Sequence, residues 1–132
     1  MKRLILLAGA AILAFSANAH AEGDAAAGEK VFRKCMACHA VGEGAKNKVG
    51  PALNGVIDGP WGHADDYKYS KPLLEGKEAG KVWDAETLSA YLEAPKKVIP
   101  KGKMAFAGLK KDDERADVIA YLAQFNADGT TK

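Results

Sequence analysis

The sequence has few of the residues that build disulfide-rich or zinc-stabilised folds. Only two cysteines occur among its 132 residues, Cys35 and Cys38. A structural zinc site needs about four protein ligands, so a single pair excludes a zinc-stabilised domain. The sequence also shows no strand pattern, no internal repeat and no long low-complexity segment. A thiol-redox motif of the thioredoxin type should lie near a βαβ pattern. The sequence has no such pattern, so it gives no support to a motif of this type.

Long apolar runs are also absent. The run from Leu4 to Phe15 is shorter than the roughly 20 residues that span a membrane. It follows the basic start Met1-Lys2-Arg3 and precedes Ala19-His20-Ala21, a small-x-small cleavage pattern. The pattern predicts a cleaved secretory signal peptide, residues 1–21, and one mature domain, residues 22–132. We therefore expect a periplasmic protein with no stable membrane insertion.

The mature chain has almost no net charge. Removal of Lys2 and Arg3 leaves 17 of the 19 basic residues against 17 acidic ones. A neutral total gives no support to nucleic-acid binding. The distribution is more informative, because the segments around 30–48 and 96–111 are rich in lysine.

The pentapeptide Cys35-Met36-Ala37-Cys38-His39 reads Cys-x-x-Cys-His, the attachment signature of a c-type haem. Two thiols at this spacing can each form a thioether with one vinyl group of the same porphyrin. His39 would then lie beneath the iron and ligate it. A thiol-redox pair or a plain disulfide are the alternatives, and both leave His39 unexplained.

Helical patterns recur through the mature chain. We expect helices at about 25–36, 70–76, 84–94 and 112–125, with loops at 40–59 and 96–108. Asp24 and Asp84 are good N-caps, and Pro95 should stop the third helix. The predicted fold class is all-α.

A second axial ligand can be sought by elimination. Met36 lies between the two cysteines, on the His39 side, and cannot reach across the ring. Met104 and His63 remain. Met104 is favoured, because it is a lone sulfur in a loop rich in proline, glycine and lysine, whereas a loop histidine is usually solvated. On the other face, the Pro51 carbonyl is the candidate acceptor for the second ring N–H of His39.

A series of markers runs through the mature chain in a fixed order. The markers are Gly28, Phe32, the Cys-x-x-Cys-His motif, residues 50–53, Tyr69, Trp83, residues 91–97, Ile99-Pro100, residues 103–106 and residues 114–122. With these markers the sequence resembles the class I cytochromes c, specifically the mitochondrial-like bacterial group that includes cytochrome c2.

The resemblance implies a fold in which crossed N- and C-terminal helices and loops wrap one covalently attached haem c. Gly28 and Phe32 would pack against Val118 and Tyr121. Five residues would surround the haem: Tyr69 and Trp83 as donors to a propionate, Tyr91 near the Met104 sulfur, Phe106 at the haem edge, and Pro51. The arginine that the family often carries before Tyr69 is missing here, and His63 could substitute for it.

The resemblance further implies a monomeric electron carrier and not an enzyme. Its partners would be a cytochrome bc1-type complex as donor and a terminal oxidase or photosynthetic reaction centre as acceptor. Docking would use lysines around the haem edge. A haem peroxidase or gas-binding protein with a dissociable sixth ligand is the main alternative, and a thiol-redox protein without haem is a third. The expected docking lysines are Lys30, Lys34, Lys46, Lys48, Lys96, Lys97, Lys101, Lys103, Lys110 and Lys111.

Overall fold

The computed structural model describes residue 9 and residues 23–132. The predicted signal peptide, apart from Gly9, lies outside the described residues. Within those residues the fold is all-α, as predicted, with two isolated β-bridges and no strand. No helix there is long and apolar enough to span a membrane. The helices are α1 (Ala25–Phe32), α2 (Lys71–Glu78), α3 (Ala85–Glu93), α4 (Pro95–Val98) and α5 (Asp112–Leu122).

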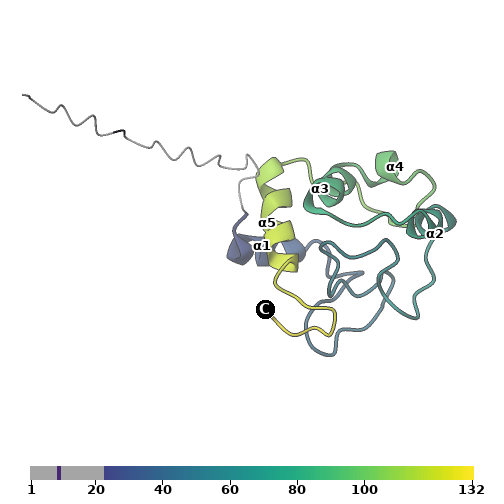
Figure 1. The fold of residues 1–132 in the computed structure, drawn as a ribbon, viewed down its shortest axis with the longest axis horizontal. Helices are drawn as coiled ribbons and strands as arrows, with labels where there is room; N and C mark the ends of the chain where they lie inside the picture. Colours follow the sequence, from purple (N-terminus) through teal and green to yellow (C-terminus); the bar gives the residue numbers. More distant parts are fainter. Residues whose placement is uncertain (1–8, 10–22) are drawn as a thin grey trace, which may run out of the picture.

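The first and last helices cross at one end of the molecule (Figure 1). Gly28 lies at the crossing, where a Cβ would collide with the Asp117 carbonyl and lie 2.8 Å from Cβ of Tyr121. The Phe32 and Tyr121 rings pack beside it, with centroids 5.5 Å apart. Glycine therefore permits the close approach of the two backbones, in the way that the resemblance implies.

Helix α1 is shorter than predicted. Asp24 caps it, accepting hydrogen bonds from the backbone N–H groups of Ala26 and Ala27. The α-helix ends at Phe32 rather than near Met36, because the following backbone N–H groups bond three residues back, as Cys35 does to Phe32. This tighter winding leads directly into the Cys-x-x-Cys-His turn.

The middle of the chain carries one helix more than predicted. Asp84 caps α3 through a 2.7 Å hydrogen bond from the Thr87 N–H, as expected. Pro95 ends α3 but also begins α4, a single turn in the segment that the sequence predicts as loop. Proline has no N–H to leave unpaired in a first turn, so it can start a helix as well as stop one.

After α5 the chain folds back on itself in a short turn and does not continue as helix. The predicted helix runs to Phe125, whereas α5 ends at Leu122 and Phe125 pairs with Thr131 in a β-bridge. The Asn126 N–H donates to the Thr130 carbonyl over 2.8 Å. Gly129 then lies against the Gly42 carbonyl, so the C-terminal segment covers the loop that follows the cysteine motif.

We predict that Gly28→Ala destabilises the protein by about 1–3 kcal/mol. The added methyl forces the two helix backbones apart, and overpacking of this kind has that magnitude. It outweighs the gain in helix propensity, which is about 1 kcal/mol. Denaturant unfolding would measure the change.

The exposed neighbour Glu29 provides a control on the same helix. Glu29→Ala should change the free energy of unfolding by no more than about 0.5 kcal/mol. Equal stabilities for the two variants would contradict the close crossing.

Candidate functional site

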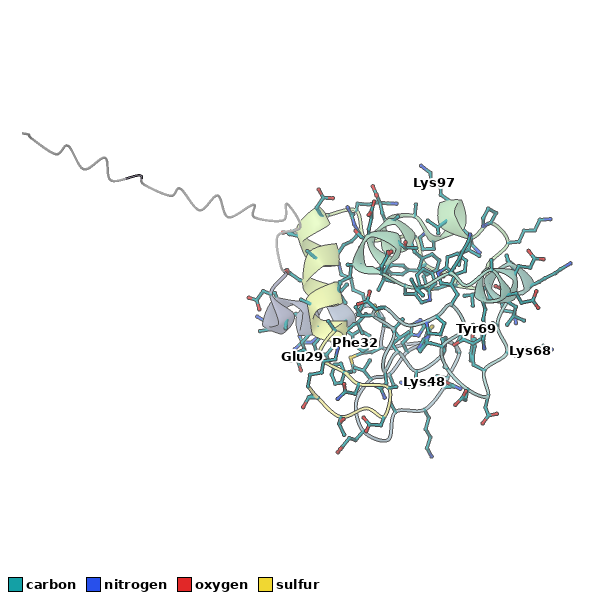
Figure 2. The ribbon with its side chains drawn as sticks, in the orientation of Figure 1. Glu29, Phe32, Lys48, Lys68, Tyr69 and Lys97 are labelled. Atoms are coloured by element: carbon teal, nitrogen blue, oxygen red, sulfur yellow. The ribbon has the colours of Figure 1, made fainter. Side chains whose placement is uncertain are left out.

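A cavity of about 480 Å³ occupies the centre of the molecule. Its size falls within the range of small-molecule and cofactor sites, and its lining is predominantly apolar. Figure 2 shows Phe32 and Tyr69 in the interior, on α1 and on the segment before α2, while Lys97 extends outward from α4. All nine predicted site residues line this cavity: Cys35, Cys38, His39, Pro51, Tyr69, Trp83, Tyr91, Met104 and Phe106.

The two cysteines and His39 share one compact turn. The backbone N–H groups of Cys38 and His39 both bond to the Cys35 carbonyl, at 3.1 and 2.9 Å. Both sulfurs are free thiols rather than a disulfide. The turn therefore presents two thiols and one imidazole to the same cavity.

The orientation of the His39 ring is fixed from two sides. Its Nδ1 lies 2.7 Å from the Pro51 carbonyl oxygen, the acceptor that the sequence predicts. A Cβ on the buried Gly50 would lie within 2.9 Å of three ring atoms, so glycine makes room for the imidazole. Donation from Nδ1 to the carbonyl leaves Nε2 with its lone pair available for a metal.

Burial lowers the pKa of His39, and the positive charge of Lys48 adds to this effect. The Pro51 carbonyl acts in the opposite direction, because it stabilises the protonated ring. The net effect favours the neutral imidazole at physiological pH. A neutral ring is the form that ligates iron.

Met104 reaches the cavity from the loop after α4. The Tyr91 hydroxyl lies 3.8 Å from its sulfur and is its donor. Burial raises the pKa of Tyr91 to about 12, so this hydroxyl keeps its proton. A donor near sulfur limits the electron density that the thioether can offer to a metal.

The end of the Met104 loop is anchored to two helices. The Leu109 N–H donates to the Leu92 carbonyl of α3 over 2.7 Å. The buried Arg115 of α5 donates through Nη1 to the Leu109 carbonyl, also over 2.7 Å, and through Nε to Ser89. The loop is therefore held in place by backbone and guanidinium hydrogen bonds.

Two further aromatic residues of the cavity wall, Tyr69 and Trp83, can donate hydrogen bonds. The Tyr69 hydroxyl accepts a hydrogen bond from the Ala64 N–H, so its own proton is left to donate. Burial raises the pKa of Tyr69, which keeps that proton in place. Trp83 stacks on Trp61, with ring centroids 4.7 Å apart and planes 20° apart.

Comparison with known proteins identifies the chain. The family model described as cytochrome c matches residues 25–126. Cytochrome c-550 from Ancylobacter novellus is 57% identical over 105 residues, which cover 80% of this chain and 98% of that protein. Cytochrome c2 from Blastochloris viridis is 44% identical over 132 residues, and each chain is covered completely.

The fold agrees with these matches. A solved structure of cytochrome c2 from Rhodospirillum centenum superposes with a TM-score of 0.74 at 46% identity, covering 79% of this chain and 99% of that one. This chain is a member of the cytochrome c family. It is of the class I, cytochrome c2 type, and it carries one haem c attached through Cys35 and Cys38.

The residues of this cytochrome fit that group. The cavity offers the two thiols for thioether bonds, an oriented imidazole and a thioether sulfur. Haem iron in cytochromes c takes such a Met/His pair, and the protein tunes its reduction potential through these ligands and their hydrogen bonds. The described lining contains no aspartate or glutamate, so the haem propionates would meet no competing carboxylate there.

His63 is placed differently from the expectation. The sequence predicts a solvated loop histidine, but the ring is half-buried and lines the cavity. Its Nε2 lies 2.9 Å from the Ala52 carbonyl oxygen. Burial lowers its pKa, partly offset by this hydrogen bond. The carbonyl of Ala52, the residue after Pro51, is therefore a hydrogen-bond partner for the His63 ring. The loop sequence alone does not reveal this contact.

Two polar residues near the site were not predicted. Tyr67 lines the cavity and donates to the Val49 carbonyl over 2.6 Å. Asn47 accepts from the Ala52 N–H and donates to the Asp65 carbonyl. Both hold the 47–52 loop against the 63–67 segment. Such links join segments far apart in the sequence, so no local pattern signals them.

The rim of the cavity is basic and apolar. The lining residues that are also exposed are Lys34, Ala37, Val49, Lys103 and Ala105. Val49 is 77% exposed, which is unusual for a large apolar side chain. The rim therefore combines positive charge with uncovered apolar surface.

We predict that Tyr91→Phe lowers the midpoint potential of the haem. Without the hydroxyl, the Met104 sulfur donates more strongly and stabilises ferric iron. A net hydrogen-bond contribution of about 0.5–1 kcal/mol corresponds to a decrease of about 20–45 mV for one electron. Spectroelectrochemical titration would measure it.

Tyr67→Phe is the matched control, because it removes a phenol from the same cavity that bonds to a backbone carbonyl and not to sulfur. Its midpoint potential should change less than that of Tyr91→Phe. The reverse order would mean that the Tyr91 hydroxyl does not act on the sulfur.

Proposed function

We propose that this cytochrome is a soluble carrier of single electrons in which His39 and Met104 are both retained on the haem iron. The supporting observation is that these two side chains line one cavity and that each is secured by a further contact. Pro51 accepts from His39, and Tyr91 donates to Met104. The bound haem would supply the ferric–ferrous couple, and Met/His ligation favours the ferrous form.

The anchoring of the Met104 loop supports a carrier over a catalyst. A peroxidase or gas-binding protein needs an open position on the iron, and Met104 would have to leave. The backbone bond from Leu109 to Leu92 and the buried Arg115 oppose that movement. With His39 and Met104 both retained as ligands, substrates would not reach the iron, and the haem edge would be the route for electrons.

The roles of the surrounding aromatic residues are part of this proposal. Tyr69 and Trp83 would donate to a haem propionate, and Phe106 would shield the haem edge. All three line the cavity, and both donors are largely buried. A buried tyrosine or tryptophan normally finds a hydrogen-bond partner.

We further propose that the rim of the cavity docks on membrane redox complexes. A cytochrome bc1-type complex would be the donor, and a terminal oxidase or photosynthetic reaction centre the acceptor. Lys103 on the rim provides positive charge beside Lys34, which is ion-paired with Glu114, and Val49 provides apolar contact. Complementary potentials of this kind raise association rates and set orientation, which suits a transient, monomeric carrier.

Location in the periplasm completes the proposal. The proposed export rests on the basic residues after Met1, the apolar run from Leu4 to Phe15 and the cleavage pattern Ala19-His20-Ala21. Mass spectrometry of the purified protein should find Glu22 at the mature N-terminus. A mature chain that begins at Met1 would contradict the export proposal.

We predict that Lys97→Glu combined with Lys103→Glu slows electron transfer with a purified bc1-type complex by at least about tenfold at low salt, because steering by charge contributes factors of 10 to 1000. Lys34 is left intact, since it pairs with Glu114 at 3.3 Å. Stopped-flow rates over a series of ionic strengths would test this, and the variant should show a flatter salt dependence.

Lys132→Glu is the control, because Lys132 is exposed at the C-terminus, which lies far from α4 and its Lys97 (Figure 1). It should keep the wild-type rate and salt dependence. Lys132→Glu changes the net charge by half as much as the double variant. A decrease in the logarithm of the rate that is half as large would therefore show that only total charge matters, and it would remove the docking assignment.

A further inference from the structure

Of the four asparagines in the sequence, only Asn54 precedes a glycine. Asparagine is chemically labile. It is most labile before glycine, because the next residue then has no side chain to hinder its backbone nitrogen or to restrict its φ angle. That nitrogen can attack the carboxamide carbon and expel ammonia, which leaves a cyclic imide that water opens to aspartate or isoaspartate. The dipeptide Asn54–Gly55 is therefore a place where the chain can modify itself.

In the structure, the Asn54 carboxamide is held through both of its polar atoms. Its Oδ1 accepts from the Gly42 N–H over 2.8 Å, and its Nδ2 donates to the Gly42 carbonyl over 2.9 Å. Beside this pair of bonds, which we call the 42–54 clasp, the Leu53 N–H donates to the Ala40 carbonyl over 3.0 Å. These contacts close the loop that orients the His39 ring.

The C-terminal segment, residues 123–132, packs directly on the clasp. The Gly55 N–H, whose nitrogen is the attacking atom, donates to the Phe125 carbonyl over 3.3 Å. A Cβ on Gly129 would lie 2.9 Å from Nδ2 of Asn54 and would collide with the carbonyl that accepts from it. One segment therefore restrains both reacting groups, and both are released when it lifts.

Water for the second step is available beside Asn54. The residue borders a second cavity of about 450 Å³, which shares only His63 with the lining of the haem cavity. Three exposed charged residues, Lys46, Asp65 and Asp66, line this second cavity, so it opens to solvent. A carboxylate formed at position 54 would also lie in the same cavity as two existing carboxylates.

We propose that Asn54–Gly55 is a deamidation site that the C-terminal segment keeps closed in the native protein. When the segment lifts, the Gly55 nitrogen bonds to Cγ of Asn54, the Cγ–Nδ2 bond breaks, and the nitrogen's proton leaves with the amino group as ammonia. Water then hydrolyses the imide to a carboxylate. This group has no proton to donate to the Gly42 carbonyl and repels it, so the clasp does not re-form. The proposal does not depend on the carrier role.

Gly129→Ala in the haem-loaded protein tests the cover. The added methyl collides with the Gly42 carbonyl and displaces the C-terminal segment, so Asn54 should deamidate at least about fivefold faster than in the wild type, since overpacking of this kind shifts the opening equilibrium by that factor. Mass spectrometry of the tryptic peptide 49–68 over a time course at mildly alkaline pH would measure the rate.

Gly80→Ala is the matched control. Gly80 has a positive φ of 77°, close to the 88° of Gly129, but no heavy atom lies within 4 Å of an added Cβ. The variant therefore carries the same backbone strain without the collision, and Asn54 should deamidate in it at the wild-type rate. Equal rates in the two variants would overturn the assignment of the C-terminal segment as the cover.

A measurement on the unaltered protein covers the case in which Gly129→Ala does not fold. Asn54 should deamidate at least about tenfold more slowly in the native holoprotein than in guanidinium chloride at the same pH, because the site must open first. Asn126, which precedes alanine, should react more slowly than Asn54 in the denaturant. Equal rates for Asn54 in native and unfolded protein, or no reaction in the unfolded protein, would overturn the proposal.

Asn54→Asp shows the effect of the product. In this variant the Leu53 amide proton should exchange with solvent faster than in the wild type, because the neighbouring clasp is lost. The Leu109 amide proton, which is bonded to the Leu92 carbonyl, should keep its exchange rate. An unchanged rate at Leu53 would contradict the loss of the clasp.

Discussion

The structure depends above all on the fixed orientation of one imidazole. His39 follows a turn whose carbonyl at Cys35 bonds two successive N–H groups, so the ring leaves the backbone at a set position. Pro51 then fixes its rotation and tautomer through Nδ1, and Gly50 provides the space. If any of these were lost, the imidazole could rotate away from the iron that the thioether bonds hold beside it.

The part of the cavity wall that carries Met104 is built by other segments of the chain. The Met104 loop is tied to α3 through Leu92 and to α5 through Arg115. Helix α5 in turn crosses α1, which leads into the cysteine turn. The two predicted ligands are therefore linked through one continuous set of contacts, and the crossing at Gly28 affects both.

Local sequence signals predicted the parts of the fold that local physics decides. The Asp24 and Asp84 caps, the cysteine turn and the Pro51 acceptor all agree with the structure, because each involves residues close in the chain or chemistry specific to one motif. The predicted positions of the helix ends were less accurate. Tight turns after Phe32 and the β-bridge at Phe125 take the place of further helix there.

Long-range contacts explain what the sequence did not reveal. Pro95 was expected only to stop a helix, and it also begins α4. His63 was expected in solvent, and the Ala52 carbonyl draws it into the cavity wall. The burial of the Trp61 indole depends on Gly76 and Trp83, which lie 15 and 22 residues away.

The most direct test of the account is an optical spectrum of the purified protein, oxidised and reduced, with and without carbon monoxide. Retention of His39 and Met104 on the iron predicts a c-type spectrum, a ferric methionine-to-iron charge-transfer band, and no change when carbon monoxide is added to the ferrous form. A c-type spectrum that lacks this band and shifts with carbon monoxide would contradict the closed, two-ligand site and assign the protein to gas binding or catalysis.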